Sequence, residues 1–140
     1  MKNILYLLIA VTLLTSCIKN SDADATPQIN DTYDIDNVYG QWLLTTINDK
    51  AAGTSISPTD ENLVVFSTAG TVKYYTNSAL TSQDTFTIIQ GKSIYTVERT
   101  YQLSYGSTTL KRSVLIAKKD TLLLADEVAN GKSYLYTHHK

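Results

Sequence analysis

The sequence predicts an all-β domain over residues 38–140, an antiparallel meander that closes into a barrel of eight to nine strands. Three observations support this fold class. Short runs rich in valine, isoleucine, threonine and tyrosine alternate apolar with polar residues, which suits a half-buried pleated surface. Turn-forming residues separate these runs. No segment after residue 38 repeats apolar residues at a helical period.

The first expected strands lie between residues 39 and 76. Residues 39–47 ("YGQWLLTTI") begin the domain, and residues 63–67 and 72–76 form a hairpin. Gly70 lies in the turn of that hairpin and is expected to take a positive φ angle, which glycine adopts without a steric penalty.

The remaining expected strands continue the same pattern to the end of the chain. Residues 85–98 ("TFTIIQGKSIYTVE") read as two short strands with a turn at Gln90-Gly91. Asn130-Gly131 is the strongest hairpin signal in the sequence. Four further strands are expected at residues 101–105, 114–117, 122–124 and 134–136.

A barrel and an immunoglobulin-like sandwich both fit this spacing of strands. A meander loses its exposed sheet edges by closing on itself, whereas a sandwich usually needs some longer crossover connections. The longest gap here runs from Asn48 to Asn62, and only residues 58–62 within it could form a single capped helical turn. The barrel is therefore favoured over the sandwich.

Composition narrows the classes of function. Residues 38–140 carry ten Lys/Arg and eight Asp/Glu, so there is no basic field of the kind that binds nucleic acid. These residues include no cysteine, so the domain must fold on its hydrophobic core without disulfides.

The N-terminus reads as an export signal. A positive residue at Lys2 precedes an apolar run at residues 4–14, which is too short to cross a bilayer as a helix, since that takes roughly 20 residues. The only cysteine, Cys17, follows directly. Leu14-Thr15-Ser16-Cys17 resembles the lipobox of bacterial lipoproteins, which implies cleavage of residues 1–16 and acylation of Cys17. Two or more acyl chains hold a protein stably on a membrane.

The expected anchor also suggests a location. Ile18 follows the cysteine in place of the aspartate that resembles an inner-membrane retention signal, so outer-membrane delivery is expected, on either the periplasmic or the surface face. Residues 17–37 are acidic, with five aspartates against Lys19, and are expected to form a flexible tether between anchor and barrel.

One motif in the first strand points to a family. Gly40-Gln41-Trp42 resembles the Gly-x-Trp signature of the lipocalins and the wider calycin superfamily, and residues 38–140 resemble the lipocalin-like domains of small bacterial lipoproteins. The resemblance implies that glycine bends the chain into the barrel floor and that the indole of Trp42 closes it. In lipocalins an arginine late in the chain packs over this tryptophan, whereas the last arginine here is Arg112.

No set of residues suggests catalysis, a metal site or a cofactor. His138 and His139 are neighbours at the C-terminus, expected in a solvated tail, and neighbours on a strand point to opposite faces. The acidic pairs Asp60-Glu61 and Asp126-Glu127 lie in expected turns, where acids serve solvation and capping. No phosphate-binding loop or nucleophile elbow is present in the sequence.

Tyrosine is the unusual residue of the chain, with ten copies, and suits both strands and the lining of an amphiphile pocket. If Trp42 points inward, alternation and the family pattern place further side chains on the same face. The candidate ligand-binding residues are Trp42, Leu44, Phe66, Tyr74, Val97, Leu122 and Tyr136.

Two hypotheses of function follow. In the first, the barrel is a non-enzymatic binding module for a small apolar or amphiphilic ligand. In the second, a packed β-domain docks another envelope protein or a polysaccharide through exposed tyrosines on one sheet face, such as Tyr75, Tyr95 and Tyr105. An enzyme is the least favoured class.

The lipobox yields the first prediction. Replacing Cys17 with alanine removes the thiol that accepts the acyl chains, so the variant should leave the detergent-phase membrane fraction and appear as a soluble or uncleaved form. Detergent-phase partitioning of the parent and the variant measures this directly. Unchanged partitioning of the variant would contradict the lipoprotein assignment.

Overall fold

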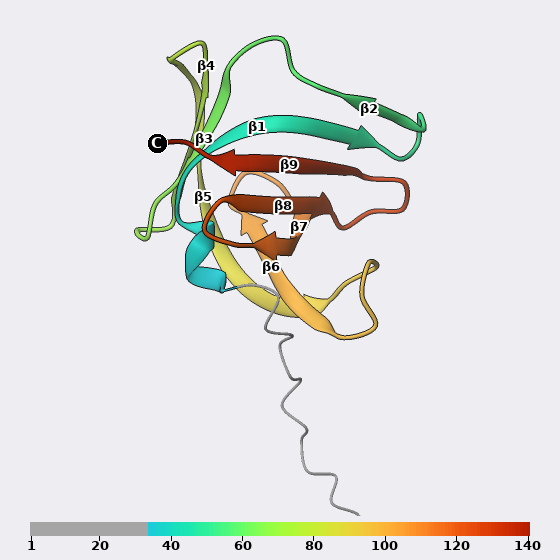
Figure 1. Cartoon of the computed structure of the whole chain (residues 1–140). Helices are drawn as coiled ribbons and strands as arrows, with labels where there is room; N and C mark the ends of the chain where they lie inside the picture. The colour runs from blue at the N-terminus through green and yellow to red at the C-terminus, as the bar shows by residue number, and fades with distance from the viewer. Residues whose placement is uncertain (1–33) are drawn as a thin grey trace, which may run out of the picture.

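The computed structural model describes residues 34–140, so Cys17, the expected signal and most of the expected tether lie outside the described residues. The predicted barrel is confirmed: eight antiparallel strands close on themselves and a ninth adds to one of them (Figure 1). No α-helix occurs among residues 34–140, and none of the helical structure found there could span a membrane. The elements are η1 (Ile35–Val38), β1 (Gly40–Asp49), β2 (Thr54–Ile56), β3 (Asn62–Phe66), β4 (Thr71–Thr76), β5 (Ala79–Lys92), β6 (Arg99–Tyr105), β7 (Lys111–Ala117), β8 (Thr121–Asp126) and β9 (Lys132–His138).

Strand β1 closes the barrel because it pairs with both ends of the meander. Its first residues pair with β3, where Gly40 lies opposite Phe66, and it pairs along its length with β9, where Trp42 lies opposite His138. The short strand β2 adds to the far end of β1, opposite residues 47–49. The sandwich alternative is therefore wrong.

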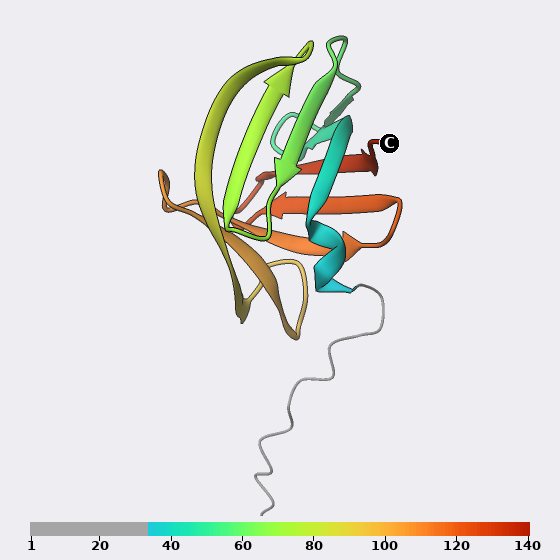
Figure 2. The same cartoon turned by 90° about the vertical axis from the view of Figure 1, so that its left-hand side faces the viewer.

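The barrel is strongly bent. Figure 2 shows β3 and β4 running steeply across the direction of β8 and β9, while the long strand β5 curves from one set of strands to the other. Residues 79–85 of β5 pair with β4, and residues 86–92 pair with β6. The pairing of β1 with β9 shifts register between Leu44 and Thr46, which marks a β-bulge or irregularity in this pair of strands. Bulges of this kind bend the strand that carries them.

The expected turns are confirmed in part. Gly70 has a φ angle of +75°, as predicted. The turn expected at Gln90-Gly91 is wrong, because β5 continues to Lys92. Gly91 serves packing instead: a Cβ atom there would lie 2.7 Å from Oε1 of Gln102, whose Nε2 donates to the carbonyl of Lys92 at 2.8 Å.

The connection between β5 and β6 is formed by residues 93–98 and is held to the turn that follows β8. The carboxylate of Glu127 accepts hydrogen bonds from the Ser93 hydroxyl at 2.5 Å and the Ile94 amide at 3.0 Å, and also from the Ser113 hydroxyl. The hydroxyl of Tyr95 donates to the carbonyl of Asp126 at 2.7 Å. These contacts explain why Ser113 is fully buried although it is polar.

Two features of the β2–β5 region were not expected from the sequence. The first is strand β2, which is exposed. The second is the first half of β5, which forms a hairpin with β4 through the two-residue turn Asn77-Ser78. Both turn residues have positive φ angles, 49° and 66°, as a type I′ hairpin requires. The helical turn considered at residues 58–62 does not form.

The folded part of the chain begins before residue 38, the boundary expected from the sequence. The 3-10 helix η1 is capped by Asp34, whose carboxylate accepts from the amide of Asp36 at 3.0 Å. The amide of Asp34 donates to the carbonyl of Ala117 at 3.1 Å, which ties this segment to β7. Residues 34–37, assigned to the tether, therefore belong to the barrel.

One end of the barrel, which we call the floor, is closed by Trp42 and packed side chains. The indole is 1% exposed, and its Nε1 donates to the carbonyl of Val38 at 2.9 Å. Gly40, at a φ angle of +131°, lets the chain turn into β1 beneath the ring, as the motif implies. The buried core of the barrel consists of Val38, Trp42, Val64, Phe66, Val72, Phe86, Leu103, Tyr105, Val114, Ala117, Leu122, Leu124 and Tyr136.

Truncating Trp42 should destabilise the fold strongly. Replacing Trp42 with alanine leaves a large cavity and an unpaired Val38 carbonyl, so we expect a loss of about 3–5 kcal/mol in the free energy of unfolding. Urea unfolding of the parent and the variant measures the difference. Trp42→Phe keeps an aromatic ring and should lose less. A loss below about 1 kcal/mol for the alanine variant is inconsistent with a floor held by this side chain.

Candidate functional site

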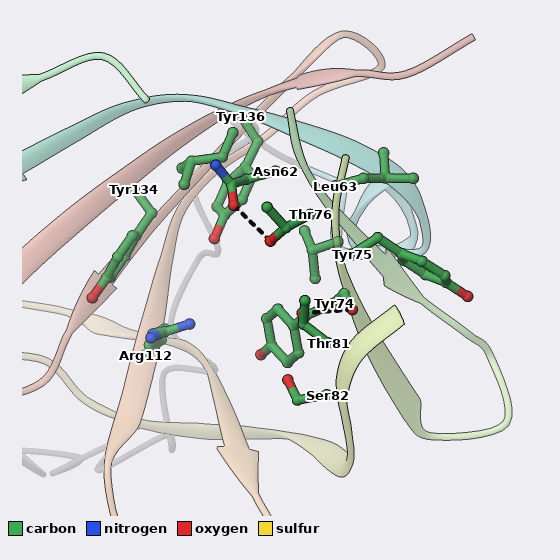
Figure 3. A pocket seen from close by; sticks show the side chains of 12 residues that line it. Asn62, Leu63, Tyr74, Tyr75, Thr76, Thr81, Ser82, Arg112, Tyr134 and Tyr136 are labelled. Atoms are coloured by element: carbon green, nitrogen blue, oxygen red, sulfur yellow. Dashed lines mark hydrogen bonds between the residues drawn. The ribbon is translucent and has the colours of Figure 1, made fainter. Parts of the chain in front are cut away.

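The interior of the barrel divides into a packed floor and a half that contains a cavity. The cavity measures about 290 Å³ and lies between strands β3–β5 on one side and β1, β7 and β9 on the other (Figure 3). Its wall is mixed, because apolar side chains are interspersed with hydroxyl groups and one guanidinium. The lining residues are Leu44, Asn62, Leu63, Val64, Tyr74, Tyr75, Thr76, Thr81, Ser82, Arg112, Tyr134 and Tyr136.

Arg112 is the charged group at the centre of this wall. Its side chain is only 19% exposed and its Nε donates to Oδ1 of Asp126 at 2.9 Å. The two residues are direct cross-strand partners of β7 and β8, so the sheet register itself sets the pair. Asp126, which the sequence placed in a solvated turn, is instead the last residue of β8 and is buried. A buried guanidinium needs such a partner, because an uncompensated charge in the interior is costly.

Two tyrosine rings flank the guanidinium. The Cζ of Arg112 lies 4.4 Å from the ring centroid of Tyr134 and 5.5 Å from that of Tyr105, within the range of cation–π attraction. The hydroxyl of Tyr134 donates to Oδ2 of Asp126 at 3.2 Å. Both carboxylate oxygens of Asp126 are thus already engaged, one by Arg112 and one by Tyr134.

Burial keeps the tyrosines of this half in their neutral form. Burial raises the pKa of Tyr105 and of Tyr136 well above the usual value for a phenol, and the positive charge of Arg112 offsets only part of this rise. Burial also raises the pKa of Tyr74. Near neutral pH these phenols therefore keep their protons and remain hydrogen-bond donors.

A second, smaller cavity of about 180 Å³ adjoins the first. It shares Tyr74, Ser82 and Arg112 with the first cavity and is lined further by Tyr105 and Asp84. The carboxylate of Asp84 is occupied, since it accepts from the amide and the hydroxyl of Ser107 and from the amide of Thr85. Arg112 and Tyr74 therefore face both spaces.

The structure brings three of the seven candidate residues to the main cavity. Leu44, Tyr74 and Tyr136 line it, from β1, β4 and β9. Trp42, Phe66 and Leu122 also point inward, but they lie in the packed floor. Phe66, for example, stacks edge-on against Phe86 with ring centroids 5.2 Å apart.

The expected position of Val97 is wrong. Val97 is fully exposed in the 93–98 connection, because the second strand expected in residues 85–98 does not form and β5 ends at Lys92. The docking face proposed from tyrosines is also not formed as expected, because Tyr105 is buried and points into the barrel.

The C-terminal histidines are not a free tail. His138 ends β9, and its ring packs edge-on against Trp42 with centroids 5.3 Å apart. The amide of His139 donates to the carbonyl of Gln41 at 2.9 Å. His138 therefore contacts the tryptophan that a late arginine covers in the lipocalin pattern, while Arg112 lies elsewhere, inside the barrel.

Sequence reasoning missed three polar residues of the cavity walls, Tyr105, Arg112 and Tyr134, and also Asp126, which holds Arg112 and Tyr134 by hydrogen bonds. A signal was available, because residues two positions apart on a strand share a face. Arg112 lies two positions before the buried Val114, and Tyr134 two before Tyr136. A charged residue on a core-facing position is unusual enough to mark a site.

Within residues 34–140, no group of three or more metal-ligating side chains comes together. Comparison of the chain with family models, with curated proteins and with solved structures found no match in any of the three. Fold and site together define the class: a closed eight-stranded antiparallel barrel with a tyrosine-rich cavity built around a buried arginine.

The buried phenols predict how stability depends on pH. Below a pH of about 10 the tyrosines are neutral in both states and the folded state keeps its full stability; above it, they ionise in the unfolded chain first. Because the folded-state pKa values of Tyr105 and Tyr136 are raised, each should reduce the free energy of unfolding by up to about 1.4 kcal/mol per pH unit there.

Urea unfolding at a series of pH values between about 9 and 11.5 tests this dependence. Tyr105→Phe removes one of the two ionising groups, so its stability should fall less steeply with pH than that of the parent. Identical slopes for the parent and Tyr105→Phe would show that Tyr105 ionises equally easily in both states.

Proposed function

We propose that this protein is a lipid-anchored lipoprotein of the outer membrane whose lipocalin-like barrel binds a small apolar or amphiphilic ligand. The cavity beside Arg112 is the observation that carries the binding role. Eight-stranded barrels either fill their interior with side chains or retain room for one small ligand, and about 290 Å³ remains here. This volume lies at the lower end of the range for ligand pockets, which favours a small ligand.

The composition of the wall supports an amphiphile. Leu44 and Val64 provide apolar contact, while Tyr74 and Tyr136 offer both a flat apolar face and a hydroxyl. Few convergent polar groups in an otherwise apolar space are typical of small-molecule sites. The proposed role is binding rather than catalysis, since the sequence contains no recognisable catalytic motif.

The anchoring part of the proposal rests on the sequence at residues 13–17, where the apolar run ends at Cys17. Attachment through acyl chains would keep the barrel at the membrane without a transmembrane helix.

A docking role remains the second candidate, because apolar side chains are exposed on two connected turns. Ile94 and Val97 lie in the 93–98 connection and Val128 in the turn after β8, and the contacts of Glu127 join the two turns. Exposed apolar clusters of this kind often mark interaction sites.

Native mass spectrometry of the barrel purified from its parent envelope tests the binding role. We expect a reproducible added mass on the parent protein. Leu44→Trp enlarges a side chain of the cavity wall and should abolish this added mass.

Leu43→Trp is the matched control, since Leu43 neighbours Leu44 in β1 but does not line the cavity. It should retain the added mass. A folded parent without any added mass, or an equal added mass on all three proteins, counts against an interior ligand and shifts support to docking.

A further inference from the structure

The hydroxyl of Tyr105 is the one buried side-chain polar atom without a hydrogen-bond partner among residues 34–140. Tyr105 is 8% exposed and lines the smaller cavity together with Arg112 and Tyr74. A buried hydroxyl without a partner costs free energy, so such a group calls for an explanation. An acceptor oxygen supplied from the cavity would satisfy it.

Arg112 offers further donors to the same place. A guanidinium carries five N–H groups, and Nε of Arg112 donates to Asp126. Arg112 lies in the wall of both cavities. Figure 3 shows Arg112, Tyr74 and Tyr136 approaching the same space from three different strands.

The nearby acceptors are already occupied. Asp126 accepts from Arg112 and Tyr134, and Asp84 accepts from Ser107 and Thr85. The carboxylates of Asp126 and Asp84 are therefore engaged, and the wall around Arg112 offers hydroxyl groups together with the guanidinium donors. Guanidinium groups bind carboxylates and phosphates through two parallel hydrogen bonds, because the planar fork of donors matches the oxygens.

We infer that the cavity takes a small organic anion whose carboxylate or phosphate oxygens are bound by the guanidinium of Arg112 and the hydroxyl of Tyr105. This inference rests on the proposed function and names the class of its ligand. Asp126 acts as a positioning residue, since its hydrogen bond to Nε orients the guanidinium.

The packing of the barrel also sets the direction of the ligand. Trp42, Phe66 and Phe86 are buried at the floor, where the rings of Phe66 and Phe86 pack edge-on, so an apolar tail is directed away from that end. Thr81 and Ser82, which line the main cavity, are exposed and mark its opening. The anionic head therefore lies inside at Arg112, and the tail runs past Leu44 toward the opening.

The charge of Asp84 opposes an anion only weakly. Its carboxylate is open to solvent, and water and salt screen exposed charges far more than buried ones. Asp126 balances the charge of Arg112, so the guanidinium acts on an anion mainly through hydrogen bonds from its remaining N–H groups.

Isothermal titration calorimetry with three probes of equal chain length tests the inference on the folded barrel. Octanoate and octyl phosphate carry the two candidate heads, and octanol carries neither charge. At least one anion should bind about tenfold or more tightly than octanol, as charge-assisted hydrogen bonds predict. The tighter of the two anions identifies the head as carboxylate or phosphate.

Variants assign the effect to named groups. Tyr105→Phe removes only the unpartnered hydroxyl and should weaken binding of the preferred anion about tenfold while leaving octanol unchanged. Arg112→Lys keeps the charge beside Asp126 but loses the planar fork of donors, and should also weaken binding of the anion. Tyr39→Phe is the matched control: Tyr39 packs near Phe86 at the floor, so its loss of a hydroxyl should change nothing.

The outcomes separate this inference from the proposed function. If octanol binds as tightly as the anions and Leu44→Trp abolishes this binding, the inference of an anionic ligand is overturned and the binding role stays intact. Anion binding that Tyr105→Phe does not weaken overturns the assigned site. A folded parent that binds none of the probes also overturns the inference of an anionic ligand. The added mass measured on the parent by native mass spectrometry decides the binding role separately.

Discussion

Strand β1 pairs with both ends of the meander, and this double pairing creates the interior in which the buried side chains pack. One strand must pair with β3 on one edge and with β9 on the other, and this closes the meander. Closure removes the exposed edges that an open sheet would offer to other chains. It also places Trp42 at the floor and Leu44 at the cavity, two residues apart on the same face. The irregularity after Leu44 then lets the strand bend around the interior.

The interior changes in character along the barrel. At the floor, aromatic and aliphatic side chains pack around Trp42, and burial of apolar surface stabilises this end. Around Arg112, the same barrel buries an ion pair and several phenols, which contribute little net stability because desolvating charges offsets their attraction. Polar groups retained in an interior at such a cost commonly serve a function, and the proposed site lies at the Arg112 end.

Alternation along single strands accounts for the part of the site that the sequence could predict. Leu44, Tyr74 and Tyr136 were expected on the inner face and line the cavity. Val97 is exposed instead, because Gln90-Gly91 has the residues of a turn although β5 continues through it to Lys92. Gly91 is required there by its close approach to Gln102, a contact between two strands that no local pattern reveals.

Strand runs, alternation and turn residues are local properties of the chain, so they predict the class of the fold without any knowledge of contacts. The same local pattern predicts that Gly40 and Trp42 begin the first strand. Three further features arise only when the barrel folds: β5 bends between two sets of strands, His138 packs on Trp42, and Arg112 meets Tyr105, Asp126 and Tyr134. The physical reason is that these contacts join residues distant in sequence, and their distances follow from strand register and barrel closure rather than from any single segment.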